Sequence, residues 1–240
     1  MKNVRGWWLP DSDTHIAEKI EEQSNTNRGY NYQTQQRDYA LSFALKYASR
    51  NKVAIDIGGH VGLWSVDMAN HFKELIIFEP VEENKKCLIK NLAARDIKNY
   101  KLYGCALGEG DGSVNLTTDD KNTGNPYVSS KGDYPVKVRT LDSFYFDRVD
   151  FIKLDVEGYE MNVLLGAEHT IRKCKPIIVL ETKDKHYERY NTSFIKIKKW
   201  LEDRHFKLDN VVNSEAIFVD KHLPTRTYFA SKHIWEKNED

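Results

Sequence analysis

Residues 56–62, with the sequence Asp-Ile-Gly-Gly-His-Val-Gly, have the types and spacing of a ligand-binding turn. They follow a short β-rich run at 53–57 and precede a helical pattern at 63–72. Glycines at such a turn let the backbone approach a ligand closely, and the helix that follows directs its free N–H groups toward it. The spacing differs from Gly-x-Gly-x-x-Gly, so the turn that binds the pyrophosphate of a dinucleotide has no counterpart here.

Glu79 ends the next β-rich run, 21 residues after Gly58. A carboxylate at that place can accept hydrogen bonds from both hydroxyls of a ribose. A glycine-rich turn alone is equally consistent with a tight strand-to-helix connection. The turn and Glu79 together favour a nucleoside-binding site.

Asp155 and Glu157 follow the fourth β-rich run, where open α/β sheets place their ligands. Asp155 is predicted to act as a general base or to hold the amino group of a cofactor, and the alternative is a cap on the following helix. Glu157 is a second catalytic candidate. Glu181 ends the fifth run, but Asp155 and Glu181 without a third ligand do not predict a metal site.

Three histidines lie where they could reach the same edge of the sheet. His60 is inside the glycine turn, where it either faces the pocket or is a hydrogen-bonded loop residue. His15 and His186 lie in segments that could reach the carboxyl ends of the strands. None of the eight histidines shows the spacing of a metal ligand set.

The elements that must position these residues alternate in type. β-rich runs at 53–57, 75–78, 100–105, 151–154 and 176–180 are separated by helical patterns, and a hairpin is expected at 206–219 with its turn at Asn213-Ser214. Helices are expected at 37–48, 63–72, 83–95, 159–171 and 193–204. The predicted fold class is α/β, a Rossmann-like mixed seven-stranded sheet with helices on both faces and a C-terminal antiparallel hairpin.

This combination resembles the FkbM-type family of S-adenosylmethionine-dependent methyltransferases, which have the class I methyltransferase fold. The resemblance covers residues 50–181, and its most specific part is Lys-x-Asp-x-Glu-Gly-x-Glu at 153–160. The segments that carry it are Asp56-Ile57-Gly58-Gly59-His60-Val61-Gly62, Phe78-Glu79-Pro80, Cys105-Ala106-Leu107-Gly108, Thr140-Leu141-Asp142, residues 152–160, Leu165-Gly166-Ala167 and residues 176–181. The family often has Ala-Asn where this chain has Gly59-His60.

The resemblance implies a methyl transfer from S-adenosylmethionine, commonly to a hydroxyl of a sugar or small-molecule scaffold. It implies that the glycines contact the methionine moiety and ribose, that Asp56 supports the loop or the ammonium group, and that Glu79 binds the ribose. The backbone at Cys105 and Ala106 would meet the adenine edge. The implied cofactor-binding residues are Asp56, Gly58, Gly59, His60, Gly62, Glu79, Cys105 and Ala106, and the catalytic candidates are Asp155 and Glu157.

Two segments lie outside the regular alternation. Residues 1–36 form an aromatic-rich N-terminal leader, and residues 37–240 are the methyltransferase-like domain. The polar insertion 117–135 is expected to be a flexible loop or a lid. We expect the leader to form a wall and the insertion a lid on the acceptor side of the pocket, although the leader's aromatics, Trp7, Trp8, Tyr30 and Tyr32, could instead cover outer helices.

The amino-acid composition limits the kinds of binding partner that can be expected. The 36 Lys+Arg balance the 36 Asp+Glu among 240 residues, so no basic excess indicates a nucleic-acid partner. The three cysteines lack ligand spacing, and no apolar run approaches the ~20 residues that cross a membrane, which favours a soluble cytoplasmic protein. The alternatives are an NAD-dependent Rossmann oxidoreductase and a non-catalytic module that keeps the fold.

Overall fold

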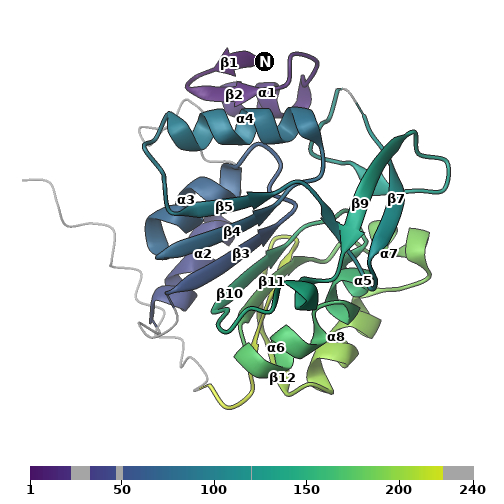
Figure 1. Cartoon of the computed structure of the whole chain (residues 1–240). Coiled ribbons are helices and arrows are strands. Elements are labelled where there is room, and N and C mark those ends of the chain that lie inside the picture. Colours follow the sequence, from purple (N-terminus) through teal and green to yellow (C-terminus); the bar gives the residue numbers. More distant parts are fainter. Residues whose placement is uncertain (23–32, 47–50, 120, 224–240) are drawn as a thin grey trace, which may run out of the picture.

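A central seven-stranded sheet organises the chain (Figure 1). The computed structural model describes residues 1–22, 33–46, 51–119 and 121–223. The strand order is β12-β13-β11-β10-β3-β4-β5, with bounds β3 Val53–Ile57, β4 Glu74–Phe78, β5 Tyr100–Tyr103, β10 Phe151–Leu154, β11 Ile177–Glu181, β12 Phe206–Val212 and β13 Glu215–Asp220. The predicted fold class is therefore confirmed.

Helices cover both faces of this sheet because its central strands are apolar on both sides. Along β3 and β4, Ala54 and Leu75 belong to one core cluster, and Ile55 and Ile76 belong to the other. The first face is covered by α1 (His15–Glu22), α2 (Thr34–Lys46), α3 (Leu63–His71) and α4 (Glu82–Ala93). The second face is covered by α5 (Glu160–Leu165), α6 (Glu168–Cys174), α7 (Asp184–Tyr187) and α8 (Phe194–Glu202).

The C-terminal hairpin forms as predicted. Strand β13 pairs antiparallel with both β11 and β12, while the pairs among β11, β10, β3, β4 and β5 are parallel. The turn falls at Asn213-Ser214, and Asn213 has a φ of 54°, a left-handed conformation that asparagine tolerates well. The hairpin places Glu215 directly beside the end of β11.

The predicted helix at 159–171 is wrong in one respect, since the structure has two helices, α5 and α6. The carbonyl of Gly166 accepts the backbone N–H of Asp142 (3.0 Å) at the break. The Asp142 carboxylate in turn accepts the N–H groups of His169 (2.9 Å) and Thr170 (2.8 Å), which caps α6 from a distant segment. A tertiary contact of this kind leaves no signal in local periodicity.

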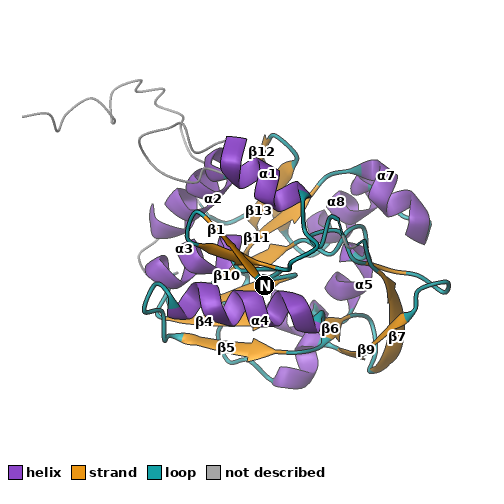
Figure 2. Ribbon diagram, turned by 90° about the horizontal axis from the view of Figure 1, so that it is seen from above, coloured by secondary structure: helices purple, strands orange, loops and turns teal. Residues whose placement is uncertain are grey.

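The leader folds onto α4. Strands β1 (Lys2–Val4) and β2 (Trp7–Leu9) form a hairpin that lies over this helix (Figures 1 and 2). The backbone N–H of Trp8 donates to Asn91 Oδ1 (2.7 Å), and Asn91 Nδ2 donates to the carbonyl of Trp8 (2.9 Å). Arg95 stacks over the Trp7 ring. These two tryptophans therefore cover an outer helix, and Tyr30 and Tyr32 lie outside the described residues.

The insertion at 117–135 is part of a second sheet, since one strand of that sheet lies within it and two others flank it. Strands β6 (Ala106–Leu107), β9 (Tyr134–Arg139), β7 (Gly112–Thr117) and β8 (Tyr127–Val128) form a second, four-stranded sheet in that order. Between β7 and β8, the Lys121 carbonyl accepts the N–H groups of Thr14 and His15 in the leader. No helix in the described ranges is long and apolar enough to cross a membrane.

Candidate active site

The glycine turn passes very close to the end of β10. Gly58 has a φ of +85°, and a Cβ added there would lie 2.0 Å from the Asp155 carbonyl oxygen. A Cβ on Gly59 would lie 2.5 Å from Ile77 Cγ2. Gly62, with a φ of +93°, immediately precedes α3. A side chain at position 58 or 59 would clash with these neighbours, so glycine is needed at both. The backbone of the turn itself therefore forms one wall of the site.

Glu79 is buried at the end of β4, with 2% of its surface exposed. Its Oε2 accepts the N–H of His60 (2.7 Å), and its Oε1 accepts the N–H of Val81 (2.8 Å). Each carboxylate oxygen has a second lone pair that can accept a further hydrogen bond. Burial raises the pKa of Glu79 to about 7, and these two N–H groups oppose the rise.

Two adjoining cavities open at the carboxyl ends of the strands. The first, which we call the β4 cavity, is lined by Phe78, Glu79, Cys105 and Ala106 among others. The second, which we call the β11 cavity, is lined by Glu181 and Lys183 together with Lys153. The two cavities share Gly58, His60, Gly124, Asp155 and Glu157, so they meet at the glycine turn and the end of β10.

Both segments outside the regular alternation contribute to the β11 cavity. His15 and Gln33 come from the leader, and Asn122 and Asn125 come from the insertion. The leader thus reaches the site through α1 and the residue before α2, whereas Trp7 and Trp8 line neither cavity. The Gln33 side chain is held by a hydrogen bond from Trp64, whose Nε1 donates to Gln33 Oε1 (2.7 Å).

Asp56 and Gly62 stand apart from the other predicted cofactor residues, because they line neither cavity. Asp56 is fully buried, and its Oδ2 accepts a hydrogen bond of 2.5 Å from Ser65 Oγ on α3. Burial raises the pKa of Asp56 to about 6, opposed by the positive charge of Lys153. Asp56 thus ties the start of α3 to β3 beneath the turn.

Asp155 forms an ion pair with Lys153, two residues earlier on the same face of β10. Lys153 Nζ lies 2.7 Å from Asp155 Oδ2, and their side chains are 3% and 23% exposed. Burial acts to raise the pKa of Asp155, but Lys153 outweighs it and holds that pKa below its usual range. Burial likewise disfavours the Lys153 ammonium, but the charges of Asp155, Asp56 and Glu215 raise its pKa.

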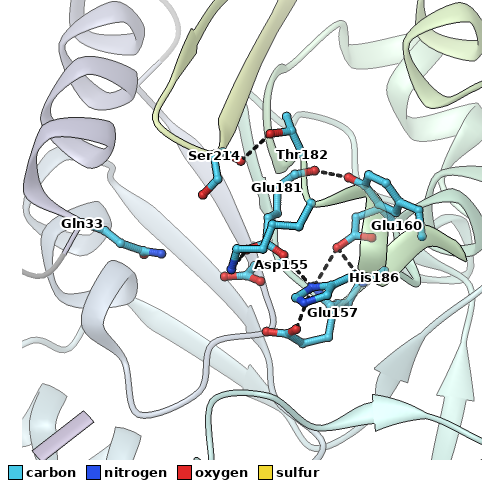
Figure 3. Close-up of polar contacts among 12 residues, drawn as sticks. Gln33, Asp155, Glu157, Glu160, Glu181, Thr182, His186 and Ser214 are labelled. Carbon is cyan, nitrogen blue, oxygen red and sulfur yellow. Dashed lines mark hydrogen bonds and ion pairs between the residues drawn. The ribbon is translucent and has the colours of Figure 1, made fainter. Parts of the chain in front are cut away.

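Glu157, Glu181 and His186 come together beside this ion pair (Figure 3). His186 Nδ1 lies 3.0 Å from Glu157 Oε2 and 3.0 Å from Glu181 Oε2. Burial raises the pKa of Glu157 to about 9, with added repulsion from Asp155 and Glu181. Burial lowers the pKa of His186 to about 4. The sequence pointed to each of these three residues separately, but the topology that joins them was not apparent from spacing.

His60 links the glycine turn to the insertion and the leader. Its Nε2 lies 2.9 Å from Thr123 Oγ1, and Asp13 accepts hydrogen bonds from the Thr123 hydroxyl and N–H. Burial lowers the pKa of His60 to about 4. His60 therefore faces both cavities and is also a hydrogen-bonded loop residue, so the two readings of its role coexist.

The residues of the β4 cavity fit an adenosine-containing cofactor. A buried carboxylate with free lone pairs lies beside a glycine backbone wall and the apolar side chains of Phe78 and Cys105. A profile of the Methyltransferase FkbM domain matches residues 56–208, well over half of the chain. The chain belongs to the FkbM methyltransferase family. S-adenosylmethionine, which the resemblance implied, is the cofactor of this family and of this chain.

Two relatives carry the name methyltransferase. The chain is 25% identical over 143 residues to Methyltransferase 1 of Beauveria bassiana. This alignment covers 48% of this chain and 57% of that protein. It is 26% identical over 200 residues to Methyltransferase sdnD of Sordaria araneosa, which covers 66% of this chain and 74% of that protein.

The fold is shared with a solved member of the family. The crystal structure of methyltransferase FkbM from Methylobacillus flagellatus aligns with a TM-score of 0.52 at 16% identity, covering 90% of this chain and 56% of that one. The chain thus spans little more than half the length of this protein and of the Beauveria bassiana relative.

Proposed function

We propose that this chain transfers a methyl group from S-adenosylmethionine to a hydroxyl oxygen of a sugar or other polar small molecule. The observation that supports this most is the pair of adjoining cavities, one with a buried carboxylate and apolar walls and one with polar walls. They meet at Gly58, Asp155 and Glu157. Methyl transfer is an in-line displacement, so donor and acceptor need separate pockets that join at the reacting atoms.

The β4 cavity is the donor side of this proposal. Glu79 would accept hydrogen bonds from the ribose hydroxyls, and the backbone at Cys105 and Ala106 would border the adenine. Gly58 and Gly59 let the turn approach the cofactor, and Asp56 supports the turn from below. When bound, S-adenosylmethionine supplies an electrophilic methyl group on a sulfonium.

Asp155 is better suited to binding a positive charge than to removing a proton. A general base works best when its pKa lies near the working pH, and Lys153 holds the pKa of Asp155 low. Of the two roles predicted for it, the geometry favours the anchor: an ionised carboxylate, at the junction of the two cavities, that holds the ammonium group of the cofactor.

The β11 cavity is the acceptor side. Gln33, Asn122, Asn125 and Lys183 line it with hydrogen-bonding groups that suit a hydroxylated acceptor. The acceptor oxygen must lose its proton as it gains the methyl group. Glu157 lines both cavities, and its ionised carboxylate is the group that can receive this proton, since a raised pKa makes it a stronger base than Asp155.

Ligand-dependent melting tests this proposal. S-adenosylhomocysteine should raise the Tm of the chain and NAD should not, because ligands stabilise only the proteins that bind them. With S-adenosylhomocysteine present, hydroxylated sugars or polyols that fit the β11 cavity should raise the Tm further. Stabilisation by NAD instead would contradict the proposal, and stabilisation by neither would favour a non-catalytic module.

A further inference from the structure

Three buried side chains from separate elements converge beside the β11 cavity, which two of them, Glu157 and Glu181, line. Glu157 comes from the turn after β10, Glu181 from the end of β11, and His186 from α7. One donor atom of each lies within 4.8 Å of the others, and all three residues are buried. Figure 3 shows the imidazole of His186 between the two carboxylates.

The spacing of these atoms suits ligands around one ion, and also one hydrogen bond between His186 and Glu181. His186 Nδ1 is 3.0 Å from an oxygen of each carboxylate. Neighbouring ligands at right angles around a metal, each bound at about 2.1 Å, lie roughly 3 Å apart. A neutral imidazole has at most one hydrogen on Nδ1, so it cannot donate a full hydrogen bond to both carboxylates. A cation between the three would satisfy all of them.

An independent observation is a buried carboxylate without any hydrogen-bond partner beside this cluster. Glu215 is 1% exposed, and neither of its oxygens has a partner. It lies directly opposite Glu181 in the β11–β13 register, so both side chains project from the same face of the sheet. A buried carboxylate with no partner is costly unless positive charge compensates it.

Two carboxylates in or beside the cluster have no ion pair with a lysine or arginine of the described residues. The acidic groups that act on it are Asp155, Glu157, Glu160, Glu181 and Glu215, and the cationic groups are Lys153, Lys183, Lys185 and Arg189. Lys153 is already paired with Asp155, and Lys183 with Glu181. Glu157 and Glu215 are the two that remain, and a cation at the cluster would stabilise their ionised forms.

We propose that Glu157, Glu181 and His186 form a binding site for one divalent transition-metal cation. One imidazole and two carboxylates suit cations from Mn²⁺ to Zn²⁺ better than Mg²⁺ or Ca²⁺, which prefer oxygen ligands alone. The sequence offered only Asp155 and Glu181 as ligands and no third one. In the structure Asp155 is paired with Lys153, and the ligands that join Glu181 are Glu157 and His186. The role of the cation rests on the proposed function: it coordinates the acceptor hydroxyl and lowers its pKa.

Mn²⁺ titration of the full chain, without cofactor or acceptor, tests the site directly. We expect one Mn²⁺ per chain by electron paramagnetic resonance and calorimetry, and at least about tenfold weaker binding in both Glu157→Gln and His186→Gln. The control is a His205→Ala/His222→Ala double variant. These exposed histidines have ring centroids 6.4 Å apart and could bind metal adventitiously, but the double variant should bind Mn²⁺ like the wild type.

Three results would overturn the site: no Mn²⁺ binding, binding that both ligand variants retain, or binding that the double variant loses. Far-UV circular dichroism and the Tm check that each variant is folded, and Glu181→Gln replaces any variant that fails this check. Because the titration needs neither methyl transfer nor an acceptor, its outcome is separate from that of the proposed function. If Mn²⁺ binds but its removal leaves methyl transfer unchanged, the site is a structural one and the role in acceptor activation is wrong.

Discussion

The two strand-end carboxylates, Glu79 and Asp155, are both buried but have opposite pKa shifts. Glu79 forms no ion pair with any residue that the structure describes, so burial raises its pKa to about 7, although two backbone N–H groups and the Asn84 side chain stabilise its charge. Asp155 has Lys153 at 2.7 Å, which keeps it ionised. The first can bind hydroxyls and the second can bind a cation. In the proposed function, the same functional group, a carboxylate, thus binds two different parts of one cofactor.

Replacing Glu79 with glutamine should weaken S-adenosylhomocysteine binding by about 10- to 100-fold. A hydrogen bond to a charged group is worth roughly 1.5–3 kcal/mol, and the neutral amide accepts through one oxygen only. Calorimetry of Glu79→Gln measures this, with Glu83→Gln on the exposed side of α4 as the control. Equal affinities in the two variants would remove Glu79 from the cofactor site.

At the scale of elements, much of the site was predictable because parallel strands end at one edge of the sheet. The turn at 56–62, Glu79 and Asp155 each follow a strand directly, so strand assignment placed them together. Three features were not predictable from local pattern. The capping of α6 by Asp142, the convergence of Glu157 with His186, and the link from Asp13 to Thr123 all depend on contacts between distant segments.

Gly58→Ala should destabilise the chain by roughly 2–4 kcal/mol. The new Cβ would meet the Asp155 carbonyl oxygen at 2.0 Å, and a φ of +85° is strained for alanine. Gly110→Ala is the matched control, since nothing lies within 4 Å of its added Cβ. Urea unfolding of both variants measures the difference. A Gly58→Ala variant as stable as the control would show that the turn does not pass β10 this closely.

Asp13 holds the leader to the insertion. Its Oδ1 accepts the N–H of Ile16 (2.8 Å) at the start of α1, and its Oδ2 accepts the N–H of Thr123 (3.1 Å). Asp13→Ala should therefore increase amide hydrogen exchange at both 15–18 and 121–125, and should raise the KM for the acceptor. Asp11→Ala, which removes an exposed carboxylate, should change neither. Faster exchange at 15–18 alone would mean that Asp13 only caps α1.

At the scale of the whole molecule, buried carboxyl groups set the pH dependence of stability. The pKa of Glu79 is raised from 4.5 to about 7, and that of Glu160 from 4.5 to about 8, both chiefly by burial. Between about pH 4.5 and pH 8, the folded state therefore binds more protons at these two groups than the unfolded state does. The stability that these groups contribute is full below about pH 4.5 and is lost as the pH rises through 7 and 8.

The free energy of unfolding of the cofactor-free chain should fall between pH 6 and pH 8.5. Urea titrations at a series of pH values measure it, and Glu79→Gln should show a shallower decline because one titrating group is gone. Stability that rises across this range in the wild type would mean that Glu79 and Glu160 are ionised without cost in the folded chain.

The central claim is that the joined cavities transfer a methyl group to oxygen. Transfer from carbon-13-methyl S-adenosylmethionine to a panel of sugars and polyols, with amines and thiols as comparison acceptors, tests it most directly. The account predicts that labelled product forms with a hydroxylated acceptor, that NMR shows the methyl carbon bonded to an ether oxygen, and that Glu79→Gln slows the reaction. Label transferred only to nitrogen, sulfur or carbon would contradict the account.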